Sequence, residues 1–180
     1  MIYVLLADGF EEIEALAPVD LLRRAGLTVV TVAVGDGSVV TGAHGISVAA
    51  DAHITDIEDC GKAELLILPG GMPGTSNLNA SADVHRLIDG AVKNGKRIAA
   101  ICAAPMILGE KGLLEGKNAT CYPGFEDHLK RAASVGGRVV TDGLITTAKG
   151  AGVAVEFAAE LISLLCGSDT AERIKNGIFA

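Results

Sequence analysis

Short runs of apolar, often β-branched residues alternate along this chain with stretches of helical periodicity. The runs predicted to be strands of a buried parallel sheet are Ile2–Leu6, Thr28–Val34, Leu65–Leu68 and Arg97–Ile101. Such alternation predicts an α/β fold with a doubly wound, mainly parallel sheet and helices on both faces. After the turn at residues 35–37, Val39–Val40 and Ile46–Ala49 are predicted to pair as a small antiparallel excursion.

Helical periodicity fills the intervals between these runs. The predicted helices are Glu12–Ala25, Ala82–Asn94, Ala104–Lys111, Glu126–Ala132 and Val153–Leu165, and further strands are expected at Asn118–Cys121, Arg138–Val140 and Leu144–Thr147. Pro18 removes a backbone donor from the first helix, which predicts a kink or a late start there. The apolar face of the second helix comprises Val84, Leu87, Ile88 and Val92. Because repeats and linkers are absent, the sequence predicts a single domain over residues 1–180.

Composition narrows the possible partners. The chain is 49% apolar but only 3% aromatic, so its core must be built from aliphatic side chains, as in a parallel sheet covered on both faces. A net charge of −7 argues against nucleic acid, because phosphate binding requires clustered cations. No segment reaches the roughly 18 uninterrupted apolar residues of a membrane span, and the apolar start is too short for a signal peptide. We therefore expect a cytoplasmic protein that binds neither nucleic acid nor membrane.

The cysteines indicate reduced thiols. Cys60, Cys102, Cys121 and Cys166 show neither the spacing of a metal site nor a dense disulfide framework, so no bound metal is expected. Cys121 is either a buried strand residue or, if it lies close to Cys102, a resolving thiol for it.

The carboxyl ends of the strands are where chemistry is expected, because ligands of open parallel sheets bind there. That rule selects Ala7–Glu14, Pro69–Asn77 and Cys102–Pro105, which should converge on one crevice. Cys102 joins a strand to a helix, and its small alanine neighbours suit the tight turn of a nucleophile elbow. The helix N-terminus favours thiolate over thiol at this position. The alternative is a cysteine that is simply buried as a small apolar residue.

A glycine-rich segment, Pro69–Gly74, follows a neighbouring strand. Its glycines allow a close backbone approach, so the amides of Gly70 or Gly71 are candidates for an oxyanion site that faces Cys102. The alternative is that this segment forms a turn without a functional role. A dinucleotide-binding fingerprint is set aside, because the segment lacks the G-x-G-x-x-G spacing and is not expected to run straight into a helix.

Three carboxylates occupy the start of the first predicted helix. The helix macrodipole accounts for Glu11 and Glu12 without any further role. Glu14 shares the side of the helix that carries Ile13 and Leu16–Ala17, so it is expected to face partly inward. A carboxyl buried beside a thiolate would have a raised pKa and would donate a hydrogen bond to the sulfur. This arrangement is one possibility that the sequence leaves open.

Three motifs together resemble the ThiJ/PfpI superfamily, and within it the DJ-1 subfamily with its bacterial relatives. They are Glu14 in the first helix, Pro69-Gly70-Gly71 after a strand, and Ala99-Ala100-Ile101-Cys102-Ala103-Ala104-Pro105. The resemblance runs from Tyr3 to about Cys166 and includes Gly143–Gly152 followed by Glu156-Phe157-Ala158. It implies a flavodoxin-like fold, a homodimer, and activities that range from aldehyde conversion and deglycation to chaperone activity and oxidative-stress sensing.

The resemblance also implies roles for individual residues. Cys102 becomes the nucleophilic and oxidation-prone cysteine, and Glu14 the protonated carboxyl that hydrogen-bonds it. Gly71 and Ala103 would supply backbone amides to an oxyanion. Two positions depart from relatives: Tyr122 stands where some have a histidine, and His44 where DJ-1 has an arginine, and both are candidate pocket residues.

The sequence therefore favours a cofactor-independent, cysteine-dependent conversion of small 2-oxoaldehydes, such as glyoxal and methylglyoxal, into hydroxy acids, with protein deglycation as a related activity. The alternative is an oxidative-stress sensor or chaperone that uses oxidation of Cys102. A cysteine amidase or peptidase is the third hypothesis. It lacks support from a neighbouring base, because Ala103 stands where protease-like relatives have a histidine.

Overall fold

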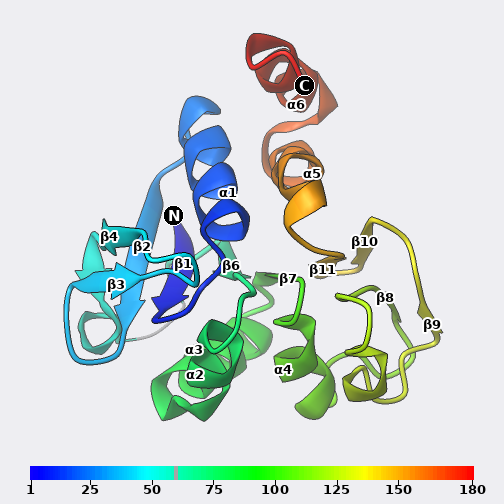
Figure 1. Ribbon diagram of the computed structural model, residues 1–180. Helices are drawn as coiled ribbons and strands as arrows, with labels where there is room; N and C mark the ends of the chain where they lie inside the picture. The colour runs from blue at the N-terminus through cyan, green and yellow to red at the C-terminus, as the bar shows by residue number, and fades with distance from the viewer. Residues whose placement is uncertain (59–60) are drawn as a thin grey trace.

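The computed structural model describes residues 1–58 and 61–180, so Cys60 lies outside the described residues. A seven-stranded sheet in the order β10-β11-β7-β6-β1-β2-β5 runs through the centre (Figure 1). Its strands are β1 (Ile2–Ala7), β2 (Val29–Val34), β5 (Ala52–His53), β6 (Leu65–Leu68), β7 (Arg97–Ile101), β10 (Val139–Asp142) and β11 (Ile145–Ala148). All neighbours pair in parallel except β10, which runs antiparallel to β11. This confirms the expected α/β fold with a mainly parallel sheet.

Helices cover both faces of the sheet (Figure 1). One face carries α1 (Glu12–Arg24), α5 (Ala154–Cys166) and α6 (Ser168–Gly177), and the other carries α2 (Gly74–Ala80), α3 (Ala82–Lys93) and α4 (Pro105–Glu110). Single-turn helices are η1 (Ile54–Asp56), η2 (Glu126–His128) and η3 (Ala151–Val153). Among the described residues, none of the helices has the length and apolar character that a membrane crossing requires.

The central strands are apolar on both sides because each side faces its own layer of helices. In β6, Leu66 and Leu68 belong to the core beneath α2, α3 and α4, whereas Leu65 and Ile67 belong to the core beneath α1 and α5. All four side chains are fully buried. The continuous apolar run that predicted a buried parallel strand thus reflects two separate cores.

Two small sheets lie beside the main one. β3 (Val39–Thr41) pairs antiparallel with β4 (Ser47–Ala49), which confirms the predicted excursion. β8 (Asn118–Ala119) pairs in parallel with β9 (Ser134–Val135). The β3–β4 hairpin returns to the carboxyl end of β1: the Gly9 amide donates to the Thr41 carbonyl and the Ala43 amide donates to the Phe10 carbonyl, both at 2.8 Å.

Several local predictions are wrong. The first helix begins at Glu12 and continues through Pro18, so the late start, one of the two alternatives predicted from this proline, is wrong. Val92 is 47% exposed, and Ala91, which lies four residues after Leu87 and therefore on the same side of α3, is buried in its place. The helix expected over Glu126–Ala132 is the single turn η2, and the strand expected to reach Cys121 ends at Ala119.

Candidate active site

Cys102 occupies a strained turn between β7 and α4. Its φ angle of 65° is in the left-handed region, which a residue with a side chain rarely adopts. Two hydrogen bonds hold this conformation: the Cys102 amide donates to the Ala148 carbonyl at 2.9 Å, and the Tyr122 amide donates to the Cys102 carbonyl at 2.8 Å. The side chain remains partly accessible. Backbone strain of this kind persists only where the surroundings enforce it, as at a nucleophile elbow.

Glu14 is the buried partner of this thiol. Its side chain is 1% exposed and forms a hydrogen bond with the Cys102 side chain. The Gly70 amide donates to Glu14 Oε2 at 3.0 Å, and the Ala151 backbone also hydrogen-bonds the carboxyl. The contact is close because Gly70 has no side chain: a Cβ there would lie 2.5 Å from Glu14 Oε2 and 2.6 Å from Cys102 Cβ.

Backbone amides also face the sulfur. The backbones of Gly71 and Ala103 form hydrogen bonds with the Cys102 side chain, and both interactions favour the thiolate. The Gly70 amide, the other candidate from the sequence, is occupied by Glu14. Gly71 adopts a φ of 90°, and a Cβ there would collide with the backbone of Glu11 and Gly9. The tight approach of this loop to the start of α1 therefore requires glycine.

The protonation states of the thiol and the carboxyl are coupled. Burial raises the pKa of Glu14 to about 7, and the charge of nearby Glu11 adds to this effect. Burial, together with the charge of an ionised Glu14, raises the pKa of Cys102 to about 12. The expectation that the helix N-terminus would favour the thiolate thus fails while Glu14 is ionised; α4 has only six residues. Over the intervening pH range the pair holds one proton, so a thiolate exists when that proton is on Glu14.

Cys121 is next to Tyr122, whose amide binds the Cys102 carbonyl, yet the two cysteines face different cores. Cys121 is 3% exposed in the core beneath α2, α3 and α4, whereas Cys102 packs against the core beneath α1 and α5. Burial raises the pKa of Cys121 to about 11. This placement favours the interpretation of Cys121 as a buried structural residue.

The glycine-rich segment continues directly into a helix, which corrects the sequence analysis. α2 begins at Gly74, but its first amides already have backbone acceptors: Gly74 donates to the Gly9 carbonyl at 3.1 Å and Thr75 to the Gly71 carbonyl at 2.9 Å. A dinucleotide phosphate needs such amides to be free, so the occupied donors argue against this ligand.

The two candidate pocket residues flank the pair on different sides. The Tyr122 side chain is half-exposed and lies across Gly150 from Glu14: a Cβ on Gly150 would be 3.3 Å from the Tyr122 ring and 3.8 Å from Glu14 Oε1. His44 lies in the β3–β4 loop above the start of α1, where its side chain is 67% exposed. The turns after β8 and β3 thus bring Tyr122 and His44 to the edge of the sheet that carries Cys102.

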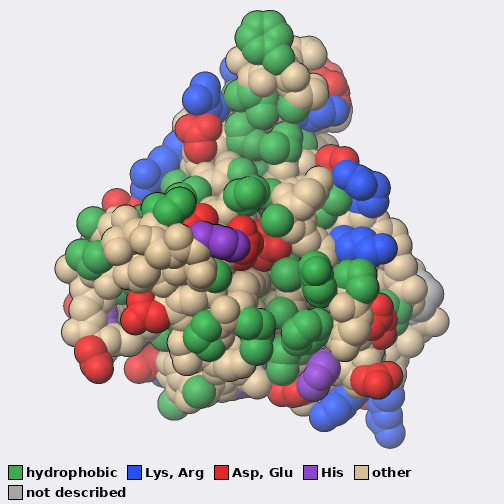
Figure 2. Space-filling model, viewed as in Figure 1, with side chains coloured by type: hydrophobic (Ala, Val, Ile, Leu, Met, Phe, Trp, Pro, Cys, Tyr) green, Lys and Arg blue, Asp and Glu red, His purple; other side chains and the backbone are tan. Residues whose placement is uncertain are grey.

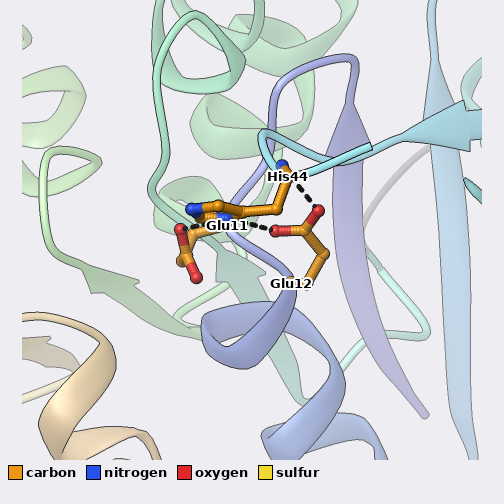
Figure 3. A group of neighbouring side chains, drawn as sticks. All are labelled: Glu11, Glu12 and His44. Carbon is orange, nitrogen blue, oxygen red and sulfur yellow. Dashed lines mark hydrogen bonds and ion pairs between the residues drawn. The ribbon is translucent and has the colours of Figure 1, made fainter. Parts of the chain in front are cut away.

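A cluster of charged side chains lies at this edge, and the sequence analysis missed it. Acidic side chains gather beside a histidine near the centre of the face in Figure 2. Figure 3 shows Glu11, Glu12 and His44 pointing toward one another, with His44 Nδ1 2.8 Å from Glu12 Oε2 and 3.5 Å from Glu11 Oε2. Nothing in the local pattern signals this contact, because it depends on the return of a hairpin 30 residues later in the chain. We describe it as an ion-pair cluster.

Comparison with known proteins gives consistent matches. The model of the DJ-1/PfpI family matches residues 1–164. Protein DJ-1 homolog B of Arabidopsis thaliana is 39% identical over 171 residues, which cover 94% of this chain and 39% of that longer protein. The chain therefore spans about two fifths of the length of that relative.

In two further matches the aligned region covers most of this chain and most of the matched protein. A protein of Pyrococcus abyssi that is named as a deglycase is 32% identical over 167 residues, or 91% of this chain and 98% of that protein. The structure of oxidized Toxoplasma gondii DJ-1 superposes with a TM-score of 0.92 at 36% identity and covers 99% of this chain and 97% of that one. The likeness therefore extends over the whole fold, including the segments that carry Cys102 and Glu14.

Proposed function

Because the chain belongs to the DJ-1/PfpI family, we propose that it is a cysteine-dependent enzyme that converts small 2-oxoaldehydes, such as glyoxal and methylglyoxal, into hydroxy acids without a cofactor. The observation that carries this proposal is the hydrogen-bonded Cys102–Glu14 pair, in which the carboxyl is buried, the thiol is partly accessible and the backbones of Gly71 and Ala103 face the sulfur. Removal of early glycation adducts is a related activity, supported by the deglycase name of the Pyrococcus relative.

The first step is addition. With the shared proton on Glu14, the Cys102 thiolate attacks the aldehyde carbon, a C–S bond forms, and the carbonyl π pair moves to oxygen. The amides of Gly71 and Ala103, which hydrogen-bond the sulfur in the free protein, are close enough to donate to this oxyanion. Protonation of the oxyanion by Glu14 gives a neutral hemithioacetal and leaves Glu14 as a carboxylate.

The second step is an internal transfer of hydrogen. Glu14 removes the proton from the former aldehyde carbon, which gives an enediolate. The hydroxyl proton on that carbon then moves to the neighbouring oxygen, and Glu14 returns its proton to the neighbouring carbon. The product is a thioester of the hydroxy acid on Cys102. Water then cleaves the C–S bond and restores the thiol, so the sum is methylglyoxal plus water to lactic acid. A carboxyl whose pKa is about 7 suits a group that must both accept and donate protons near neutral pH.

Oxidation of Cys102 is the second candidate function. The sulfur of Cys102 is partly accessible, and the amides beside it would stabilise the oxygen of a sulfenic or sulfinic acid. The similar Toxoplasma gondii structure is described as oxidized. In this alternative the protein responds to peroxide, with one equivalent of oxidant reduced to water for each oxygen added to sulfur. The amidase or peptidase hypothesis gains no support, because Ala103 occupies the position next to the nucleophile and brings no base.

A homodimer in the cytoplasm completes the proposal. Ile13 and Ile46 are both more than half exposed at the edge that carries the site, and Ile13 also borders a hollow of about 480 Å³ whose walls include Ala154 and Val155. Exposed apolar side chains beside a hollow favour contact with a second copy of the chain. Size-exclusion chromatography with light scattering measures the mass directly, and the doubled mass is the expected result.

The decisive experiment measures lactate formed from methylglyoxal in buffer free of thiols and amines, so that reversible trapping of the aldehyde is not counted as turnover. Wild type, Cys102→Ser and Glu14→Gln are compared, with Cys166→Ser as the matched control, because Cys166 is an exposed cysteine at the end of α5. Many equivalents of lactate from wild type and Cys166→Ser, and none from Cys102→Ser, are expected. One equivalent or less from wild type would overturn the proposal and favour the redox function.

A further inference from the structure

The ion-pair cluster at the start of α1 is built around a buried carboxylate. The Glu12 side chain is only 7% exposed. It accepts hydrogen bonds from His44 Nδ1 and from the His44 amide, each at 2.8 Å. Gly42 lies directly on the Glu12 side chain, where a Cβ would leave no room. These hydrogen bonds lower the pKa of Glu12 to about 2 although burial opposes them, so Glu12 is ionised throughout the neutral range. The hydrogen bond to Glu12 thus fixes the position of the His44 imidazole.

Glu11 links this cluster to the candidate active site. Its side chain is 17% exposed and lies 3.5 Å from His44 Nδ1, while its amide donates to the Gly70 carbonyl at 2.9 Å. Gly70 in turn donates its own amide to Glu14. The negative charge of Glu11 disfavours ionisation of Glu14. A cation placed beside Glu11 offsets that charge, so His44 acts on the Cys102–Glu14 pair without touching it.

We propose that His44, anchored by Glu12, is a positioning residue that partly neutralises Glu11 and thereby sets the pH at which the Cys102–Glu14 pair releases its first proton. The inference deepens the proposed function, on which its catalytic meaning rests. His44 is suited to this role because Glu12 fixes the position of its ring, and because the pairing with Glu12 and the charges of Glu11 and Glu12 raise its pKa, which favours the cation near neutral pH.

Within residues 1–58 and 61–180, few charged groups face the two sites. His44 is faced by Glu11 and Glu12 of α1. Glu14 is faced by Glu11 from the start of its own helix, by Cys102 from the turn after β7, and by Tyr122 across Gly150. Asp8 is occupied on the far side of the hairpin, where it accepts the Thr41 amide. Glu11 is therefore the group through which His44 acts.

The sign of the effect follows from these charges. Removal of the His44 cation leaves the Glu11 charge uncompensated, so the pair keeps its proton to higher pH. Removal of the Glu11 charge has the opposite effect, and the pair loses its proton at lower pH. A lysine at position 44 restores a positive charge and is expected to reverse the effect of a neutral side chain.

The test measures the rate at which iodoacetamide alkylates Cys102 as a function of pH, with the modified cysteine identified by mass spectrometry. Only the thiolate reacts, and thiolate appears once the pair has lost its first proton, so the profile should have an inflection near pH 7 in the wild type. His44→Gln should move this inflection up by about half a pH unit, Glu11→Gln down by about one, and His44→Lys back toward the wild-type value. The readout does not require turnover, so it remains informative if no lactate is formed.

His128→Gln is the matched control, because His128 Nδ1 pairs with Glu110 Oε1 at 2.9 Å on a different part of the surface. Its inflection should equal that of the wild type. If His44→Gln and Glu11→Gln shift the inflection in the same direction, or leave it where it is, the inference is overturned. The same shifts should appear in the acid limb of kcat/KM for methylglyoxal. Their absence there, with the alkylation shifts present, would count against the proposed function and leave the electrostatic link standing.

Discussion

Glu12 and Glu14 lie two residues apart on α1 and are both buried, yet their pKa values are shifted in opposite directions. The pKa of Glu12 falls to about 2, whereas that of Glu14 rises to about 7. Glu12 faces the β3–β4 hairpin, which supplies an imidazole and backbone amides. Glu14 faces the carboxyl end of the sheet, where its neighbours are a thiol and the negative charge of Glu11.

Burial alone therefore does not determine the protonation state of a carboxyl or its chemical role. A carboxylate that gains a cation and amides stays ionised and serves as an anchor. A carboxyl that gains amides but no cation holds its proton near neutral pH and can transfer it. Two such environments within one helical turn are possible because a hairpin covers one side of the helix and a strand end the other.

The largest expected effect separates the two residues by activity. Glu14→Gln cannot accept or return the substrate proton, so kcat for lactate formation should fall by about a hundredfold or more. Glu12→Gln retains Glu14 and Cys102 and should lose less than about tenfold, because it acts only through the hairpin. Initial rates of lactate formation at saturating methylglyoxal measure both. Equal losses of kcat in the two variants would show that Glu14 has no catalytic role beyond that of Glu12.

The next effect concerns stability. Because Glu14 has a folded-state pKa of about 7 against 4.5 in the unfolded chain, ionisation penalises the folded state increasingly as pH rises between these values. Glu14→Gln has no charge to bury. The free energy of unfolding of Glu14→Gln relative to wild type should therefore rise by about 2 to 3 kcal/mol between about pH 5 and pH 8. Urea unfolding at both pH values measures this difference, and a flat difference would show that Glu14 is ionised in the folded protein.

Two glycine substitutions test how tightly the surroundings of Glu14 and of Glu12 are packed. A Cβ on Gly70 would meet Glu14 Oε2, the Cys102 Cβ and the Ile101 carbonyl oxygen within 2.5–2.9 Å, and the last two cannot move freely. The three nearest atoms to a Cβ on Gly42 all belong to the Glu12 side chain, which can shift if it gives up its hydrogen bonds to His44. Gly70→Ala should therefore cost about 2 kcal/mol, and Gly42→Ala clearly less. Gly152→Ala, which would meet nothing within 4 Å, is the control in the same urea experiments. A smaller cost for Gly70→Ala than for Gly42→Ala would contradict the packing described here.

The sequence predicts the architecture well because the signals are local. The runs that become β1, β2, β6 and β7 are apolar and β-branched, and their order implies a parallel sheet. The position of Cys102 between β7 and α4 can likewise be predicted, since strand ends and the rule for ligand sites suffice. By contrast, the sequence does not predict α2, because Gly74–Ala80 contains one large apolar residue and shows no helical periodicity.

The parts of the site that depend on residues close together in the sequence could be predicted, whereas those that depend on contacts between distant segments could not. Helical periodicity predicts the burial of Glu14 only in part, because Ile13, on whose side Glu14 is expected, is 55% exposed. The raised pKa of Glu14 follows from its burial. The partnership of Glu12 with His44 joins residues 32 positions apart through a hairpin return, and no pattern in either segment indicates it. Glu12 was assigned to the macrodipole for that reason. Predicting the direction of a pKa shift therefore requires knowledge of the tertiary neighbours, whereas predicting where the carboxyl lies does not.

The smallest expected effect concerns the anchor itself. In the folded protein the pKa of His44 is raised and that of Glu12 is lowered, so their pairing stabilises the fold most between about pH 4.5 and pH 6.5. The contribution is lost above this window as His44 deprotonates, and below it as Glu12 becomes protonated. His44→Gln should therefore lower the Tm by no more than a few degrees at about pH 5.5 and by less at about pH 9, since the imidazole is exposed. Calorimetry at both pH values measures this difference, and a larger loss at pH 9 would show that His44 supports the hairpin by packing rather than by charge.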